Sequence, residues 1–389
     1  MTLSAPKKYY SRFLKGHEGK LHFAAHSHHF WPDVTRDAQL AYWDDCALLS
    51  DEKWNKVFSE VIPKAQKHIA KILHLEDSEQ IVFAPNTHEL TSRILSLFIG
   101  QPKLSILTTA SEFHSLNRQL KRLEEIPEVK VTRVKVTSSL ITELKSKLQA
   151  KPDLFFVSQV FFDSGMALSD ADLIELAKYK SPETLMIVDG YHAFGAIPTN
   201  LSELEGKIFY LGGGYKYAQA GEGACFMVTP PGTWRPVYTG WFAEYDDLGK
   251  TPGAQVGYAP KAMSFMGATQ DPSALYRFNA VWDLYEKEGF GVPEIHTYVK
   301  SLQQEFLRLL PQEFQALWQL SPLFSDLTWH GHFLTFQAAT EELAKECQET
   351  LKKAQILIDR RGSRLRFGFG LYQDLSDVLE LTDAIKKLI

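Results

Sequence analysis

Between about residues 79 and 228, short apolar runs alternate with stretches of helical periodicity, and this alternation limits the folds open to the chain. Parallel strands need long crossover connections, which are usually helices. The pattern therefore predicts an α/β fold in which a mostly parallel, seven-stranded central sheet carries helices on both faces. We expect strands at 80–84, 104–108, 129–136, 154–159, 185–189, 208–211 and 224–228, with helices at 87–99, 114–125, 138–150 and 169–179 between most of them.

The segments on either side differ from this alternation. The helical pattern that precedes it is broken near Ser50, and Pro63 either kinks the second helix or marks its start. Residues 230–271 lack periodicity but are rich in glycine, proline and aromatic residues, which predicts an ordered loop region near a site or a subunit contact. Further elements are expected as helices at 33–49 and 53–73, a helical stretch from 272 to about 310 with a break at 289–293, strands near 331–337 and 364–368, and helices near 340–354 and 374–388.

Charge and composition exclude several classes of protein. The net charge is −5 and no long basic run occurs, which argues against a nucleic-acid partner. No segment reaches the ~18 consecutive apolar residues that a membrane helix needs, and the N-terminus has no apolar stretch of signal-peptide type. Cys46, Cys225 and Cys347 are too few and too scattered for a disulfide framework or a zinc cluster. We expect a cytoplasmic protein without a membrane partner or a bound metal.

Two neighbouring segments carry residues that could bind a ligand or take part in catalysis. In LMIVDGYHAFG, Asp189 ends an apolar strand, at the edge of a parallel sheet where ligands bind, and His192 follows. In KIFYLGGGYKYAQAGEG, Tyr215, Lys216 and a further tyrosine lie between glycines that allow a flat ligand to approach the backbone. Each segment alone has an ordinary alternative, because Asp189 could cap a helix and Lys216 could be a solvated lysine in a hairpin.

Together, the two segments match the needs of pyridoxal phosphate (PLP). This cofactor takes a lysine amine, here Lys216, for its imine, and a carboxylate, here Asp189, for its ring nitrogen. Its phosphate suits the positive end of a helix. Such a helix is predicted after the strand in IVFAPNTHEL, where Asn86, Thr87 and His88 begin it. Asn86 or Thr87 could also simply cap that helix, and the two roles are compatible.

The same segments resemble the class V, fold-type I PLP enzymes, most closely kynureninase and more distantly the cysteine desulfurases. VDGYHAFGAIP, GGYKYAQAGEG and NTHEL carry the resemblance, which extends over nearly the whole chain. It implies that residues 76–270 form the large PLP-binding domain and 271–389 the small domain. Residues 1–75 are expected to pack with the small domain.

The resemblance also implies roles for individual residues. Lys216 would be the Schiff-base lysine, Tyr215 a phosphate ligand or proton relay, and His192 a neighbour of the cofactor ring. Phe113, in SEFHSLNR, falls at the position that stacks on the ring. Arg366, in SRLRFGFG, matches the arginine that binds the substrate carboxylate, for which its planar fork is suited.

Other matching segments imply a homodimer with shared sites. TGWF contains Trp241, which matches a tryptophan that reaches the cofactor phosphate across the dimer interface. SFMGATQDP points to Thr269 as a further residue from the partner subunit. Family members place their N-terminal segment over the cofactor, so His28 of SHHFWP is expected to bind substrate.

Several observations bear on the reaction. The chain is expected to act on an amino acid as a kynureninase-like hydrolase that cleaves a Cβ–Cγ bond, with class V aminotransferase as the alternative. FFDSG, with Phe161 and Phe162, departs from the family pattern and weakens the substrate assignment. Cysteine desulfuration ranks lower because Cys347 lies in a helical pattern rather than a mobile loop. A metal site in HFAAHSHH lacks an acidic or cysteine partner, and a non-catalytic PLP-fold binding protein remains a further alternative.

Overall fold

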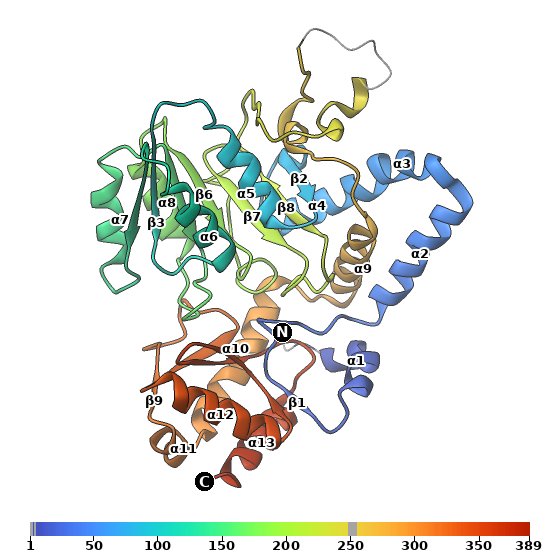
Figure 1. Cartoon of the computed structure of the whole chain (residues 1–389). Coiled ribbons are helices and arrows are strands. Elements are labelled where there is room, and N and C mark those ends of the chain that lie inside the picture. The colour runs from blue at the N-terminus through green and yellow to red at the C-terminus, as the bar shows by residue number, and fades with distance from the viewer. Residues whose placement is uncertain (1–2, 4, 248–254) are drawn as a thin grey trace.

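A seven-stranded sheet forms the centre of the larger part of the molecule in the computed structural model, which describes residues 3, 5–247 and 255–389 (Figure 1). Its strand order is β2-β8-β7-β6-β5-β3-β4, and every neighbouring pair is parallel except the two that involve β8. The predicted seven-stranded, mostly parallel sheet is thus confirmed. The strands are β2 (Ile81–Ala84), β3 (Leu104–Thr109), β4 (Val129–Val134), β5 (Leu154–Ser158), β6 (Leu185–Asp189), β7 (Phe209–Gly213) and β8 (Cys225–Val228).

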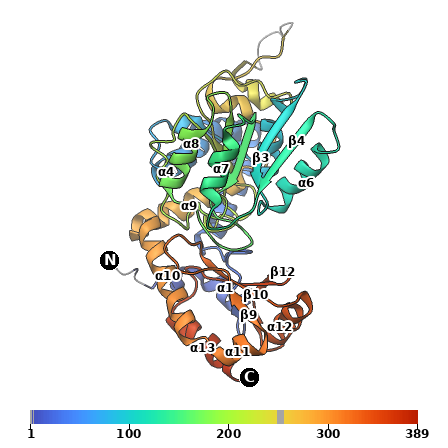
Figure 2. The same ribbon diagram turned by 90° about the vertical axis from the view of Figure 1, so that its left-hand side faces the viewer.

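Both faces of this sheet are buried, which explains why its strands read as continuous apolar runs. In β2 the side chains of Ile81 and Phe83 enter one hydrophobic cluster, while Val82 and Ala84 enter another on the opposite face. Figure 2 shows helices on the two sides of the sheet. The first cluster includes residues of α4 (Ile62–Leu73), α7 (Leu140–Leu148) and α8 (Asp170–Tyr179), and the second includes residues of α5 (Thr87–Ser96) and α6 (His114–Leu123).

The helices before the sheet follow the predicted break. A turn at Ser50–Glu52 separates α2 from α3, and a π-helical turn at Val57–Val61 then leads into α4. Pro63 lies in the first turn of α4, directly after the π-helical turn, where the α-helical hydrogen-bond pattern is already interrupted. These helices pack on the large part of the molecule, against α9 (Ser273–Glu288). The earlier helices are α1 (Ser11–Gly16), α2 (Val34–Leu49) and α3 (Lys53–Lys56).

The loop region predicted at 230–271 contains two 3-10 turns, Trp241–Asp247 and Lys261–Phe265. Phe242 and Phe265 are buried in the hydrophobic cluster that covers one face of the sheet, so this part of the loop is packed on the domain. Residues 248–254 of the predicted region lie outside the described residues.

A second, antiparallel sheet of order β12-β13-β10-β9 forms the smaller unit. The N-terminal segment joins this unit, because β1 pairs in parallel with β11. The division into domains at residues 75 and 270 remains a prediction. No helix among the described residues is both long and apolar enough to cross a membrane. The elements are β1 (Leu21–His22), α10 (Val292–Leu309), α11 (Gln312–Leu317), β9 (Leu320–Pro322), β10 (Phe333–Ala338), α12 (Glu341–Lys353), β11 (Ile356–Leu357), β12 (Asp359–Arg361), β13 (Arg364–Gly368) and α13 (Leu375–Lys386).

Candidate active site

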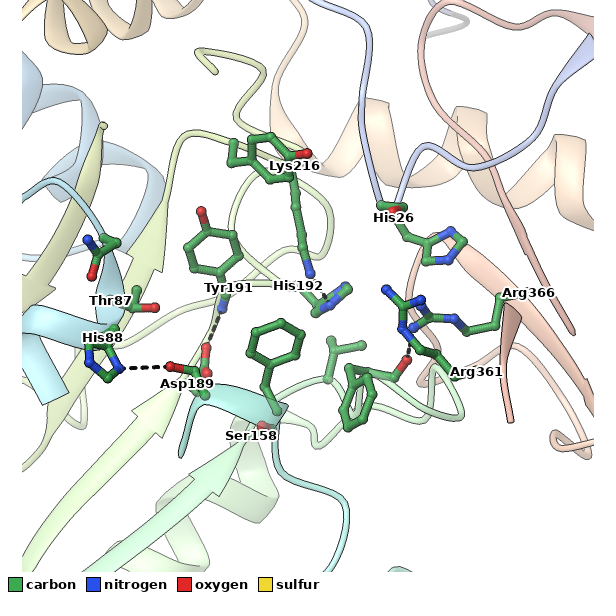
Figure 3. Close-up of a pocket in the computed structure, with 17 residues that line it drawn as sticks. His26, Thr87, His88, Ser158, Asp189, Tyr191, His192, Lys216, Arg361 and Arg366 are labelled. Atoms are coloured by element: carbon green, nitrogen blue, oxygen red, sulfur yellow. Dashed lines mark hydrogen bonds between the residues drawn. The ribbon is translucent and has the colours of Figure 1, made fainter. Parts of the chain in front are cut away.

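A cavity of about 420 Å³ lies between the strand ends of the large sheet and the small unit (Figure 3). Nine of the twelve predicted site residues line it; His28, Trp241 and Thr269 do not. The structure thus brings together residues from distant segments of the chain. The lining comprises His26, Ser27, Asn86, Thr87, His88, Phe113, Ser115, Ser158, Val160, Phe162, Asp189, Tyr191, His192, Tyr215, Lys216, Arg361 and Arg366.

Asp189 ends β6 and presents its carboxylate to the cavity. Its Oδ1 accepts a hydrogen bond of 2.9 Å from the Tyr191 backbone amide, which fixes the side chain. Burial raises the carboxyl pKa, because the charged form loses its hydration. The next residue must be glycine, since a Cβ at Gly190 would lie 1.9 Å from the Tyr210 hydroxyl. A partner that carries a proton on a ring nitrogen would stabilise the Asp189 charge.

Lys216 follows β7 and enters the cavity from the opposite side (Figure 3). Its Nζ hydrogen-bonds to Nε2 of His192 and lies 5.4 and 5.6 Å from the ring centroids of Tyr191 and Phe113. Burial, together with the charge of Arg366, lowers the pKa of the amine to about 7. A substantial fraction of Lys216 is therefore neutral and nucleophilic near neutral pH. The Lys216 amine and the Asp189 carboxylate thus line the same cavity.

His192 lies beside the Lys216 amine, on the side facing Arg366 and His26, with its ring buried (Figure 3). Burial lowers its pKa well below the usual range, and the neighbouring Lys216 charge acts in the same direction. The imidazole is therefore neutral. Its Nδ1 is buried and has no hydrogen-bond partner within the described part of the chain. A buried polar atom without a partner is costly, and this one suits a ligand group that can hydrogen-bond to it.

The start of α5 forms the third side of the cavity. Asn86 caps the helix, its Oδ1 accepting a 2.9 Å hydrogen bond from the Glu89 amide. Thr87 and His88 occupy the first turn, where backbone amides lack partners within the helix and the dipole favours an anion. The His88 ring is 2.9 Å from the Ser115 hydroxyl, so this side chain is directed toward α6. The cavity thus presents the Lys216 amine, the Asp189 carboxylate, the buried Nδ1 of His192 and the N-terminus of α5. Together these groups fit pyridoxal phosphate.

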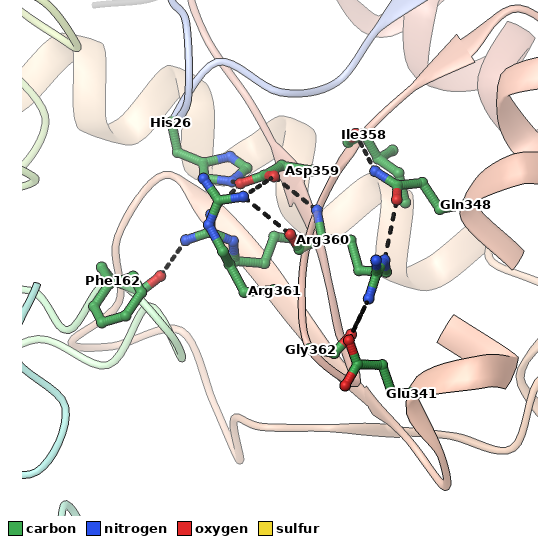
Figure 4. A network of polar contacts seen from close by, with 10 residues as sticks. His26, Phe162, Glu341, Gln348, Ile358, Asp359, Arg360, Arg361 and Gly362 are labelled. Atoms are coloured by element: carbon green, nitrogen blue, oxygen red, sulfur yellow. Dashed lines mark hydrogen bonds and ion pairs between the residues drawn. The ribbon is translucent and has the colours of Figure 1, made fainter. Parts of the chain in front are cut away.

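The wall contributed by the small unit is basic (Figure 4). Arg366, on β13, pairs with Asp359 and donates to the Phe162 carbonyl oxygen. Arg361 contacts the other oxygen of Asp359 at 3.2 Å. The buried ring of His26 stacks on Phe333, and its Nε2 lies 3.5 Å from Asp359. Burial lowers the His26 pKa to about 3, so this side chain is also neutral.

The remaining three predicted residues lie elsewhere. His28 has its Nδ1 3.3 Å from the Tyr215 hydroxyl, so it contacts a cavity residue rather than the cavity itself. The histidine of this segment that reaches the cavity is His26. Trp241 donates a 3.3 Å hydrogen bond to Thr269, and both are exposed on the surface. Their predicted contribution to a partner subunit's site remains a prediction.

Sequence analysis missed several residues of the site. Arg361 and His26 were overlooked because nothing in RRGSRLR or HSHH indicates which side chain points inward. Ser158 lines the cavity, and its hydroxyl donates to Glu112 at 2.5 Å. Burial raises the Glu112 pKa to about 7. Glu112 does not itself line the cavity; it lies in the quoted SEFHSLNR segment, three residues after the end of β3, and an acidic residue so close to a strand end was an available signal.

Known proteins share this fold and this order of elements. The cystine C–S lyase C-DES, in a variant with glycine covalently linked to PLP, has 16% identity and a TM-score of 0.79 over 97% of this chain and 98% of its own. The cysteine desulfurase of Thermococcus onnurineus has 16% identity and a TM-score of 0.80 over 100% and 99%. The cysteine desulfurase CsdA of Escherichia coli has 14% identity and a TM-score of 0.77 over 100% and 99%.

At these identities the likeness establishes the fold alone. The names of these structures describe a lyase and desulfurases rather than kynureninase, to which the sequence motifs are expected to be most similar, so the kynureninase-like assignment is not shown. No curated protein sequence matches the chain. A family model described as Aminotransferase class-V, however, matches residues 31–318, which is most of the chain. The chain therefore belongs to the class V aminotransferase family, whose members are enzymes that use pyridoxal phosphate.

Proposed function

We propose that Lys216 binds pyridoxal phosphate covalently and that the enzyme activates the Cα–H bond of an amino-acid substrate. One observation carries this proposal: the Lys216 amine and the Asp189 carboxylate meet in a single cavity beside the N-terminus of α5. When bound, the cofactor supplies a protonated ring that withdraws electrons from the substrate Cα. Asp189 would hold the proton on the ring nitrogen, and the amides of the first turn of α5 would bind the phosphate.

The other residues of the cavity have roles that follow from their positions. Lys216, displaced by the substrate amine, would remove the Cα proton, for which its lowered pKa of about 7 is suited. His192 touches Lys216 and would orient it. Arg366 would bind the substrate carboxylate through its free guanidinium hydrogens. Phe113 and Tyr191 lie near the amine and would exclude water from it.

The candidate reactions differ in the step that follows removal of the Cα proton. Kynureninase-like hydrolysis of Cβ–Cγ is favoured by the TGWF and YKY segments. Elimination from Cβ, as in a C–S lyase, is compatible with the position of the cysteines. None of the three lines the cavity, and burial raises the pKa of Cys225 to about 11 and of Cys347 to about 12. A desulfurase that uses its own thiolate is therefore a poor fit, whereas elimination needs no protein thiol.

A product screen separates these candidates. The holoenzyme is incubated with kynurenine, cysteine, cystine and acidic amino acids, and anthranilate, sulfide, pyruvate and keto acids are measured. We expect at least one amino acid to change the cofactor absorption and to yield a product. Anthranilate with alanine would identify hydrolysis, sulfur release with pyruvate would identify elimination, and a keto acid retaining the carbon skeleton would identify transamination. A holoenzyme that turned over no amino acid would favour a binding protein.

The lowered pKa of Lys216 predicts how cofactor capture depends on pH. Below the pKa of about 7 the amine is protonated and cannot attack the cofactor aldehyde; above it the neutral form predominates. The rate of reconstitution should rise about tenfold per pH unit below 7 and then level off. Stopped-flow absorbance of the cofactor-free protein mixed with PLP measures this rate. Free lysine, with a pKa near ~10.4, is the control, and a protein rate that still climbed tenfold per unit at pH 9 would contradict the assignment.

A further inference from the structure

Two guanidinium groups on the small-unit wall share one carboxylate. Arg366 pairs with Oδ2 of Asp359, and Arg361 lies 3.2 Å from Oδ1 of the same residue. The two cations therefore lie next to each other in the same wall of the cavity (Figure 3). Arg364, another arginine of this hairpin, forms an ion pair with Asp163 of the large domain.

The charges in this wall do not balance. Two guanidinium groups face one carboxylate, and the adjacent His26 is neutral because it is buried. Among the described residues, Asp189 is the only acidic side chain that lines the cavity, and it lies at the opposite side, near α5 (Figure 3). Phe162 and Val160 make the neighbouring surface apolar. A net positive charge beside apolar surface favours an anionic ligand group at this end.

The two arginines differ in depth. The side chain of Arg366 is 4% exposed and its guanidinium is held by Asp359 and the Phe162 carbonyl. The side chain of Arg361 is 46% exposed and contacts Asp359 and the Arg360 carbonyl. Arg366 thus occupies the buried end suited to the α-carboxylate, which every amino-acid substrate carries. Arg361 lies nearer the mouth, where a substrate side chain would extend.

We propose that Arg361 is a specificity-determining residue that binds a second anionic group, so that the substrate is an amino acid with a carboxylate or similar anion on its side chain. This inference rests on the proposed function only through the role of Arg366 and the location of the site. It does not depend on which substrate bond is finally broken. The bidentate geometry of a guanidinium suits a carboxylate, a sulfinate or a sulfonate alike.

The neighbouring Arg360 provides a matched control. Successive residues of a strand point to opposite faces, and Arg360 points away from the cavity. It donates to Gln348 and to the Gly362 carbonyl and lies 3.3 Å from Glu341 (Figure 4). Arg360→Gln therefore removes the same charge from the same strand without touching the cavity. A long-range effect of charge alone would appear equally in both variants.

The test uses ligands that cannot react, because they lack an amino group. Calorimetry compares succinate with succinamate, and glutarate with glutaramate, each pair differing by one charge, on the holoenzyme. We expect the wild type and Arg360→Gln to bind the dicarboxylate about tenfold or more tightly than its monoamide. Arg361→Gln should reduce this ratio to about one. Arg361→Lys, which keeps the charge but loses the fork, should retain part of it.

Three results would overturn the inference. The first is a wild-type ratio near one. The second is an equal loss of affinity for both ligands in Arg361→Gln, which would mean that Arg361 assists Arg366 with a single carboxylate. The third is an unchanged affinity for both ligands in Arg361→Gln. The cofactor absorbance of the same samples shows independently whether PLP is bound. Failure of the proposed function can therefore be recognised separately from failure of this inference.

Discussion

Replacing Lys216 by alanine is expected to abolish covalent cofactor binding and to remove nearly all activity. The variant should lose the absorption band near ~420 nm that lysine-bound PLP gives. The rate with any substrate should fall by at least ~10³-fold, because the amine is both the attachment point and the base at Cα. Spectroscopy after dialysis measures the first effect. Borohydride reduction followed by peptide mass analysis should place the pyridoxyl group on Lys216 in the wild type.

Lys180 supplies the control for this substitution. It is a partly buried lysine of the large part of the molecule, its pKa is also lowered by burial, and it donates to the Thr184 carbonyl away from the cavity. Lys180→Ala should keep the band and the activity. Retention of colour in dialysed Lys216→Ala, or a pyridoxyl group on another lysine in the wild type, would refute the attachment site. Loss of the band in both variants would point to a folding defect, which circular dichroism would detect.

The fold was largely predictable because its signal is local and repeated. Six of the seven strands are almost wholly buried, so they appear in the sequence as apolar runs, whereas the edge strand β4 (VKVTRV) alternates and is only partly buried. The π-helical turn at Val57–Val61 was not predictable, because its sequence fits a continuous helix and only packing selects the extra residue per turn. The short strands β11 and β12 were missed for a similar reason, since their pairing partners are β1 and β13.

The site was predictable where chemistry is carried by an unusual residue at a strand end. Asp189 and Lys216 stand out against their apolar and glycine-rich surroundings. The basic wall was only partly predictable, because the direction of a side chain in β12 depends on how the hairpin docks. Arg360 and Arg361 are adjacent and chemically identical, yet one faces Gln348 and the other the cavity. His26 and His28 differ in the same way.

The charge of the basic wall also bears on the choice of reaction. Kynurenine has a neutral aromatic side chain, so a site that selects an anionic side chain argues against the hydrolase candidate. It favours transamination of an acidic amino acid, or elimination from a substrate whose leaving group at Cβ carries the anion. The two experiments are therefore linked: a strong preference for dicarboxylates together with release of anthranilate from kynurenine would be inconsistent. In that case Arg361 would have to swing out of the cavity, which its exposure of 46% allows.

Asp189→Asn is expected to produce the second large effect, without loss of the cofactor. The amide is isosteric with the carboxylate and can still accept the 2.9 Å hydrogen bond from the Tyr191 amide. It cannot, however, balance a proton on the ring nitrogen. Removing one partner of a buried ion pair costs about 3–5 kcal/mol, which corresponds to a rate lowered on the order of 10²- to 10⁴-fold. Steady-state kinetics of the reconstituted variant measures this, and its band near ~420 nm should weaken or shift.

Asp153→Asn is the matched control, because Asp153 precedes β5, at the opposite end of the strands. Its carboxylate accepts hydrogen bonds of 2.7 Å from the Ser105 amide and hydroxyl, far from the cavity. This variant should alter thermal stability and leave the cofactor spectrum and the rate unchanged. If Asp189→Asn retained full activity, the ring would have to be activated by another group. His192 is a poor replacement, since a buried neutral imidazole carries no charge to balance the proton. Full activity would therefore remove the electrostatic basis of the proposed Cα activation.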